Sequence, residues 1–144
     1  MTLYLDTSSL IKLYVEEADS AVVRGLVGQA AVVATSVITY AETRAALARL
    51  RREGRLTGST YVSAKRAFED QWPAYLSLYV TDQLSRAAGE LAERYRLRGY
   101  DSVQLASFAE VARRAGIRET RFSSFDDRLN RAARSLTRRT SRLA

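Results

Sequence analysis

The chain has 144 residues, of which 47% are hydrophobic, and this size and composition fit a single folded domain with an ordinary core. It contains no cysteine and no histidine, which excludes disulfides, thiol nucleophiles, Ser-His-Asp triads and ordinary zinc sites. The 23 lysines and arginines outnumber the 16 acidic residues, and the net charge of +7 favours a polyanionic partner such as nucleic acid, with a merely solvated basic surface as the alternative.

Apolar runs in this sequence are short. Asp6 and Lys12 interrupt the first of them, and no run of 18 or more uncharged apolar residues follows. We therefore expect a cytoplasmic protein with no membrane segment and no export signal.

Strand-like and helix-like segments alternate along the chain. The strand candidates are residues 3–5, 31–37, 76–80 and 120–125. The helix candidates are residues 8–16, 20–28, 38–52, 58–72, 82–97, 102–114 and 128–136. This alternation predicts an α/β fold, a three-layer α/β/α sandwich with a central, mainly parallel sheet. Short connectors and the lack of internal repeats predict one domain over residues 1–144, ending in a basic segment over about residues 128–144.

Acidic residues follow the strand candidates at the places where open parallel sheets bind ligands. Asp6 follows the first strand candidate, and Asp126 and Asp127 follow the last. Asp101 opens a helix after a glycine turn, and Glu42 lies inside a helix at the border of its apolar face. Without histidine or cysteine, a cluster of such carboxylates would suit a hard metal ion such as Mg²⁺ or Mn²⁺.

Each acid also has a simpler structural interpretation. Aspartate is a favoured helix cap, and Asp101 with Gln104 matches a capping box. Asp6 would precede an ordinary Thr/Ser helix cap, and Asp126 or Asp127 would cap the arginine-rich helix that follows. Glu42 has Arg49 on the same helix, and a surface salt bridge between them would account for it.

Four stretches carry these residues in a recognisable order and spacing between residues 2 and 136. They are LYLDTSSLIKLYVEE, VVATSVITYAETRAAL, RGYDSVQLASFAEVAR and FSSFDDRLNRAA. Together they resemble the PIN-domain family, and most closely the VapC-type ribonuclease toxins of bacterial and archaeal toxin–antitoxin pairs. One departure is Gln104, which stands where many relatives carry histidine.

The resemblance implies a metal-dependent endoribonuclease, in which one or two Mg²⁺ or Mn²⁺ ions activate water for attack on an RNA phosphodiester bond. The implied catalytic and metal-binding acids are Asp6, Glu42, Asp101 and Asp126. The implied assisting positions are Thr7, Ser8, Ser124 and Asp127, the last also being the alternative to Asp126 as fourth acid.

The resemblance also implies partners: an RNA substrate, a small VapB-like antitoxin that packs against the active-site groove, and a second copy of the chain in a homodimer. Positive charge must flank the acids to bring phosphates toward them. The arginines that stand close to the acids in the sequence, and that we expect to contact RNA, are Arg44, Arg98, Arg128 and Arg131.

Two other classes of function are open at this point. Phosphatases with an aspartyl nucleophile also begin with an apolar strand ending in aspartate, but they need a second acid two residues later, where this chain has Ser8. A catalytically inactive PIN-like module that binds RNA or a protein partner is the other alternative. It predicts that metal neither binds nor stabilises the protein.

Overall fold

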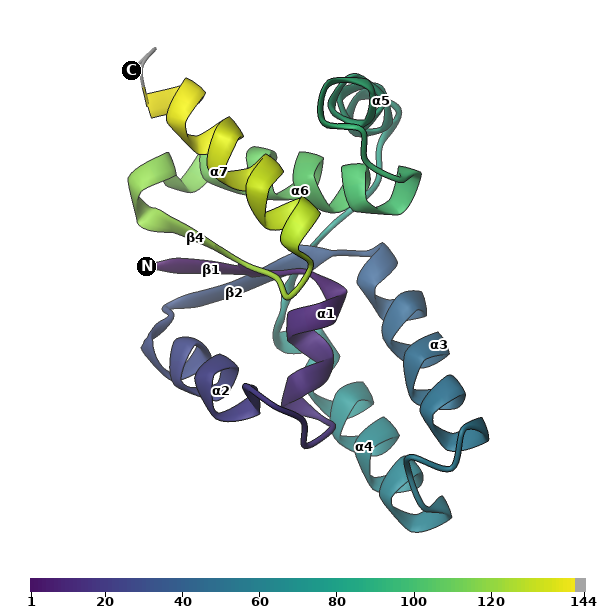
Figure 1. Cartoon of the computed structure of the whole chain (residues 1–144). Helices are drawn as coiled ribbons and strands as arrows, with labels where there is room; N and C mark the ends of the chain where they lie inside the picture. The colour runs from purple at the N-terminus through teal and green to yellow at the C-terminus, as the bar shows by residue number, and fades with distance from the viewer. Residues whose placement is uncertain (142–144) are drawn as a thin grey trace.

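A computed structural model describes residues 1–141 of the chain (Figure 1). The strands are β1 (Thr2–Leu5), β2 (Val32–Ser36), β3 (Leu76–Leu78) and β4 (Thr120–Ser123). The α-helices are α1 (Thr7–Leu10), α2 (Ser20–Gln29), α3 (Ile38–Arg52), α4 (Gly58–Gln71), α5 (Asp82–Tyr95), α6 (Gly99–Ala115) and α7 (Asp127–Ser141). The 3₁₀ helices are η1 (Ile11–Leu13), η2 (Trp72–Ala74) and η3 (Ile117–Glu119). Residues 142–144, the end of the predicted basic segment, lie outside the described residues.

The strands form one parallel sheet in the order β3-β2-β1-β4. Helices α5, α6 and α7 cover one face, and α1, α2, α3 and α4 lie on the other side (Figure 1). This arrangement confirms the predicted three-layer α/β/α sandwich with a parallel central sheet. Within residues 1–141, no helix is long and apolar enough to cross a lipid bilayer.

Strand β1 shows why both faces of the sheet are covered. Successive side chains of a strand point to opposite faces. Tyr4 belongs to the core beneath α5, α6 and α7, whereas Leu3 and Leu5 belong to the core on the other face. All three side chains are fully buried, so β1 is the centre of both cores.

The order of the strands reverses beside β1. The chain runs from β1 to β2 and β3 through helices on one face, and then crosses the opposite face through α5 and α6 to reach β4 on the other side of β1. Right-handed crossovers require this change of face. The carboxyl ends of β1 and β4 therefore form the switch point at which open parallel sheets bind ligands.

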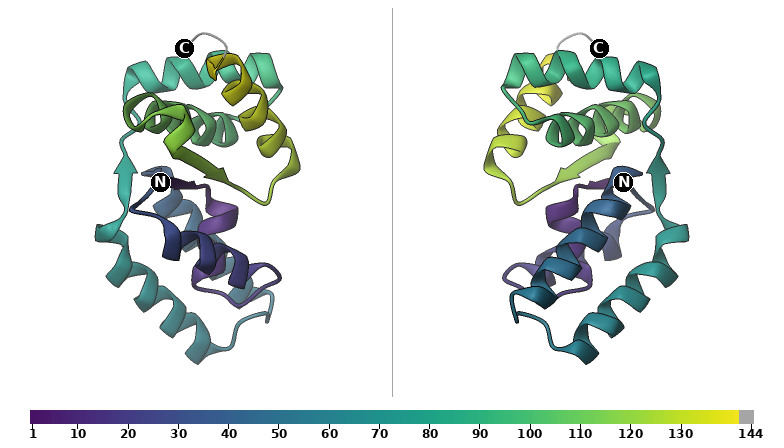
Figure 2. Two further views of the ribbon diagram at one scale, coloured as in Figure 1. Left: turned by 90° about the vertical axis from the view of Figure 1, so that its left-hand side faces the viewer. Right: turned by 90° about the vertical axis from the view of Figure 1, so that its right-hand side faces the viewer.

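Helices α3 and α4 form a pair that extends away from the sheet (Figure 2). A third apolar cluster fastens the pair to the segment after β1, and it consists of Ile11, Val15, Leu47, Leu50 and Ala64. Gly54 makes the turn between the two helices with a φ of +73°, a conformation that L-residues with side chains rarely adopt. The outer part of α3 is thereby held beside α1 and η1.

Three predicted helices differ clearly from the observed ones, and one of them, predicted over residues 128–136, continues as α7 to Ser141. The helix predicted over residues 8–16 ends as α1 at Leu10 and continues as the 3₁₀ helix η1, in which Lys12 turns to donate to the carbonyl oxygen of Ala18 at 2.9 Å. The helix predicted over 102–114 begins three residues earlier, at Gly99. Glycine is a poor helix former, so the sequence around Gly99 did not predict that the helix begins there.

Candidate active site

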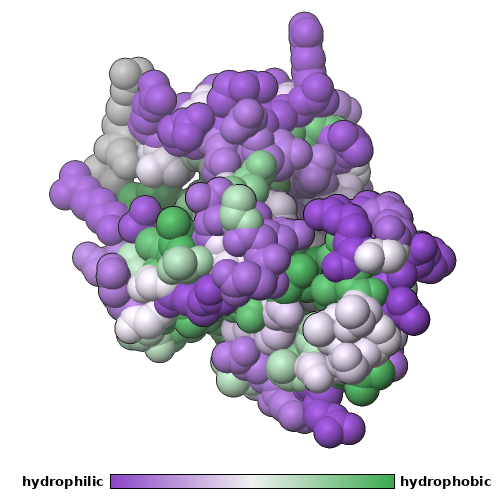
Figure 3. All heavy atoms as spheres, turned by 60° about the horizontal axis from the view of Figure 1, so that its bottom comes forward, coloured by the Kyte–Doolittle hydropathy of each residue, from purple (hydrophilic) through white to green (hydrophobic). Residues whose placement is uncertain are grey.

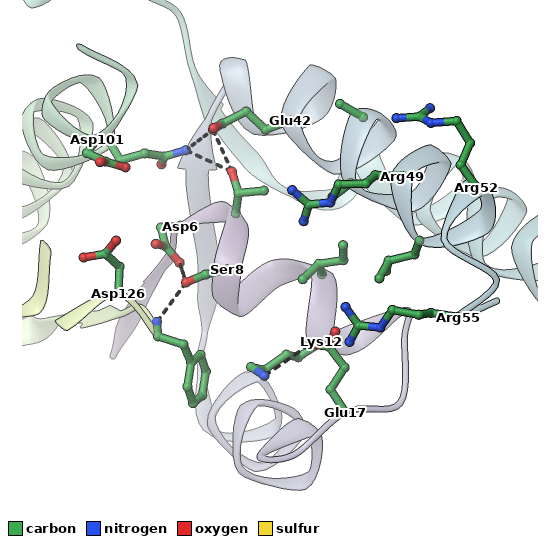
Figure 4. A pocket seen from close by; sticks show the side chains of 17 residues that line it. Asp6, Ser8, Lys12, Glu17, Glu42, Arg49, Arg52, Arg55, Asp101 and Asp126 are labelled. Atoms are coloured by element: carbon green, nitrogen blue, oxygen red, sulfur yellow. Dashed lines mark hydrogen bonds and ion pairs between the residues drawn. The ribbon is translucent and has the colours of Figure 1, made fainter. Parts of the chain in front are cut away.

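The four acids selected from the sequence line one pocket at the carboxyl ends of β1 and β4 (Figure 4). They come from four segments of the chain: the β1–α1 junction, helix α3, the first turn of α6 and the β4–α7 junction. They are Asp6, Glu42, Asp101 and Asp126. Thr7 and Ser8 line the same pocket, whereas Asp127 is exposed outside it.

Asp6 is the most deeply buried of these acids, with 4% of its surface exposed. Its Oδ1 accepts hydrogen bonds from the Ser9 backbone N–H (3.0 Å) and the Ser8 hydroxyl (2.7 Å). Its Oδ2 accepts one from the Ser124 hydroxyl (2.6 Å). Burial raises the pKa of Asp6 to about 6, against the lowering effect of these hydrogen bonds, and the nearby charge of Glu42 raises it further. A cation beside Asp6 would relieve this penalty on the charged form.

Glu42 is held by a buried polar network. Its Oε1 accepts hydrogen bonds from the Thr7 hydroxyl (2.7 Å) and the Gln104 amide (2.9 Å). The same amide donates to the Thr39 hydroxyl at 2.9 Å, and its carbonyl accepts from the Tyr4 hydroxyl at 2.7 Å. Gln104 thus connects β1, α3 and α6 and orients the Glu42 carboxylate.

The role of Gln104 and the surroundings of Glu42 correct two interpretations of the sequence. The capping box proposed for Asp101 is wrong, because Arg98 is the N-cap residue of α6 and Gln104 lies inside the helix. The salt bridge proposed for Glu42 is also wrong, since Arg49 has its ion pair with Glu53, at 3.9 Å. The sequence offered one signal for Gln104, a polar residue within the mostly apolar run VQLASFA.

Asp126 lies close enough to Asp101 to shift its pKa. Burial raises the pKa of Asp101, the charge of Asp126 raises it further, and Glu42 adds to this, whereas Arg98 and Arg128 lower it. Asp126 caps α7, because its Oδ1 accepts a hydrogen bond from the backbone N–H of Leu129 at 2.8 Å.

Capping and pocket lining occur together in two of the four acids. Asp6 caps α1 and Asp126 caps α7, and both still line the pocket. The cap hydrogen bond occupies Oδ1 in each case, so Oδ2 of Asp126 is left for another partner. Helix capping and metal binding are therefore compatible roles for these two aspartates.

The four carboxylates suit a hard cation, because they line one pocket and the pKa values of Asp6 and Asp101 are raised there. Among residues 1–141, no three acidic side chains already stand in a metal-binding arrangement. Binding one ion to three of these acids therefore requires some of their side chains to move.

The arginines predicted to contact RNA lie in different places. Arg44 forms an ion pair with Glu69 and does not line the pocket. Arg98 and Arg128 lie near Asp101, since both lower its pKa, and Arg131 lies further along α7.

Other basic residues line the pocket instead. They were not predicted, because the prediction selected arginines that stand close to the acids along the sequence. The basic residues that line the pocket are Lys12, Arg49, Arg52 and Arg55. Helical periodicity was the available signal for one of them, because Arg49 follows Glu42 by seven residues and so returns to nearly the same face of α3.

Comparisons with known proteins identify related chains. The family model of the PIN domain matches residues 3–135. Ribonuclease VapC45 and Ribonuclease VapC49, from two strains of Mycobacterium tuberculosis, are each 37% identical over 108 residues, which is 75% of this chain and 75% of the relative.

Two solved structures share the fold. VapC20 of Mycobacterium tuberculosis, a toxin that cleaves the sarcin-ricin loop, has a TM-score of 0.66 and 24% identity over 90% of this chain and 94% of its own. The protein PAE2754 from Pyrobaculum aerophilum has a TM-score of 0.62 and 19% identity over 98% and 90%, respectively. From these matches, the chain belongs to the PIN-domain family, among its VapC-type ribonucleases.

Proposed function

We propose that this VapC-type ribonuclease hydrolyses RNA phosphodiester bonds with one or two Mg²⁺ or Mn²⁺ ions held by Asp6, Glu42, Asp101 and Asp126. One observation carries the proposal: four carboxylates from four separate segments line a single pocket at the switch point of the sheet. Stability alone gives no reason to gather them, because the charge of Glu42 raises the pKa of Asp6, and the charges of Asp126 and Glu42 raise the pKa of Asp101.

The residues of the pocket have distinct tasks in this proposal. When bound, the metal ion lowers the pKa of its water and neutralises charge on the scissile phosphate. Ser8, Ser124 and the Ser9 N–H fix the Asp6 carboxylate, so it presents a set geometry. Both hydrogen bonds to Glu42 end on Oε1, and Oε2 is the oxygen that we assign to accepting a proton from water.

The VapC relatives imply an RNA substrate and a VapB-type antitoxin for this chain. An antitoxin segment that enters the pocket would reach Glu42, Asp101 and Asp126 more readily than Asp6, because all three are less buried. We also propose the homodimer that the family resemblance implies.

Thermal unfolding tests the metal site. Purified protein is unfolded in EDTA and then in millimolar Mn²⁺ or Mg²⁺, and the same ions are used in an RNA-cleavage assay. We expect the ion to raise the unfolding temperature of the parent and of an Asp70→Asn control, whose carboxylate is exposed on α4 away from the pocket, but not that of Asp6→Asn. The ions and variants that show a raised unfolding temperature should be the ones that cleave RNA. A protein that binds RNA but shows neither stabilisation nor cleavage would instead be the inactive binding module.

A neighbouring pair of variants identifies the fourth acid. Asp126→Asn removes a carboxylate from the pocket. Asparagine caps helices as well as aspartate does, so α7 should stay intact. Asp127→Asn makes the same change one residue later, outside the pocket. We expect metal stabilisation to fall in the first variant only, and the reverse result would exchange the roles of these residues.

A further inference from the structure

The pocket that holds the acids has a second end with the opposite charge. Beyond Glu42 it continues along α3 to Arg49 and Arg52, and then to Arg55 in the turn that follows the helix. Figure 4 shows the Arg49 and Arg55 side chains reaching into the pocket on the side away from Asp101 and Asp126. We call these three residues the arginine end of the pocket.

Apolar side chains form the floor between the arginines. Ile11 and Leu50 are 8% and 3% exposed and belong to the cluster that fastens α3 to η1, and Ala46 packs against the same cluster. Figure 3 shows areas of apolar surface between hydrophilic side chains on the side of the molecule that lies at the bottom of Figure 1. The arginine end therefore offers positive charge above a firmly packed apolar surface.

The positive charge at this end is largely uncompensated. Arg49 faces only the exposed Glu53 at 3.9 Å, a contact of little strength in water. Within residues 1–141, Arg52 and Arg55 have no acidic oxygen within 4.0 Å.

Two other charged residues of the pocket, Lys12 and Glu17, neutralise each other. Lys12 pairs with Glu17 at 3.2 Å and lies 4.5 Å from the centre of the Phe125 ring. Counting Glu53 beside Arg49, the arginine end thus keeps an excess of two positive charges.

An RNA strand matches both properties. Arginine binds phosphate through two parallel N–H groups, and a base or ribose can rest on an apolar floor. A strand whose scissile phosphate lies among four carboxylates needs compensating charge nearby, and Arg49 stands about 10 Å along α3 from Glu42, the span of a few nucleotides.

We propose that Arg49, Arg52 and Arg55 bind backbone phosphates of the RNA a few nucleotides from the bond that is cut, with the strand lying over Ile11, Ala46 and Leu50. This inference rests on the proposed function of the acids, since it places the same strand across both ends of the pocket.

A binding titration tests the inference without cleavage. The full chain in EDTA is titrated against a fluorescein-labelled single-stranded RNA of about 12 nucleotides, and anisotropy is recorded at several KCl concentrations. The test variant is Arg49→Ala/Arg55→Ala, and the matched control is Arg66→Ala, an exposed arginine on α4 outside the pocket. Both alter exposed side chains, and unfolding curves verify that each variant is folded.

We expect the double variant to bind at least about tenfold more weakly at low salt, with a salt slope reduced by about 1.4 because two phosphate contacts are lost. Arg66→Ala should stay within about twofold of the parent, as a rim charge without a phosphate contact does. Parental affinity and slope in the double variant would overturn the inference. So would unchanged RNA binding with lost binding of a VapB-type antitoxin, because the arginines would then serve the protein partner.

Cleavage kinetics separate this inference from the proposed function. If the parent cleaves RNA with Mn²⁺ and the double variant has a raised KM with kcat little changed, both proposals stand. If the parent cleaves and KM does not change, the inference fails alone. If the parent does not cleave, the proposed function fails, and the anisotropy data still decide whether the arginine end binds RNA.

Discussion

Two carboxylates at the acid end of the pocket, those of Asp6 and Glu42, are fixed by hydrogen bonds within the protein, whereas the arginine end consists of exposed side chains of α3 and of the turn after it. Asp6 and Glu42 together accept five hydrogen bonds from serine, threonine, glutamine and backbone groups. Arg49 and Arg55 reach into the pocket on long side chains above the apolar floor.

This difference matches what each end has to do. Chemistry at a phosphate needs carboxylates in a set geometry, since a displaced ligand costs rate. Attraction of a phosphate backbone needs only positive charge within reach, and flexible arginines supply it. The comparison therefore predicts that changes at the acid end lower kcat and changes at the arginine end raise KM.

The largest effect should come from Asp101→Asn. Asp101 lies in the first turn of α6 without capping it, so its loss should leave the fold intact. We expect kcat with Mn²⁺ to fall by about 10³-fold, because a metal-binding charge is lost. The KM for RNA should stay the same or decrease, since one negative charge that repels phosphate is gone. Steady-state kinetics check this, and a raised KM with unchanged kcat would place Asp101 in substrate binding.

The second effect concerns pH and the free energy of unfolding in EDTA. Burial raises the pKa of Asp6 to about 6, about two units above that of an unfolded aspartate. The folded state therefore binds the proton more tightly, and this contribution to stability is present below about pH 4 and lost as the pH rises through about 6. The metal-free parent should lose on the order of 3 kcal/mol over this range through Asp6.

Asp6→Asn separates this effect from the other titrating groups. Asparagine caps helices and fills the same space, so the variant should keep α1 and lose the pH-dependent contribution of residue 6. Urea unfolding of both proteins at about pH 4.5 and about pH 7.5 measures the difference. Equal pH dependence in the two proteins would show that the Asp6 carboxylate is better solvated than its 4% exposure indicates.

A third effect tests how Glu42 is held. Gln104→Leu removes the amide that bonds to Glu42, Thr39 and Tyr4, and leaves buried polar groups unpaired. We expect unfolding to become easier by about 1–3 kcal/mol and kcat to fall as Glu42 loses its orientation. Gln104→His, which keeps a ring N–H to donate, is the matched control. Lost stability with parental kcat in Gln104→Leu would make this residue purely structural.

Local patterns predicted the positions of the acids but not the contacts that hold them. Asp6 and Asp126 were placed correctly at the ends of β1 and β4, because the ends of parallel strands meet at one edge. The role of Gln104 depends on Tyr4, 100 residues earlier, and no local pattern encodes such a contact. The start of α6 was missed because Gly99 is a poor helix former.

The arginines show a different kind of failure, one that periodicity would have avoided. Arg44 was chosen because it stands two residues from Glu42, yet two residues along a helix lead to another face. Arg49, seven residues away, returns to the face of Glu42 and lines the pocket. Distance along the sequence was the wrong measure on a helix.

The smallest effect, Arg44→Ala, tests this distinction directly. Arg44 is paired with Glu69, and both side chains are about one third exposed, so solvent screening limits the loss of stability to less than about 1 kcal/mol. Arg44→Ala and Arg49→Ala remove the same charge from the same helix, five residues apart. We expect weaker RNA binding in the anisotropy titration only for Arg49→Ala. Equal losses would mean that RNA responds to the net charge of α3 as a whole, and the two ends of the pocket would then no longer divide affinity from chemistry.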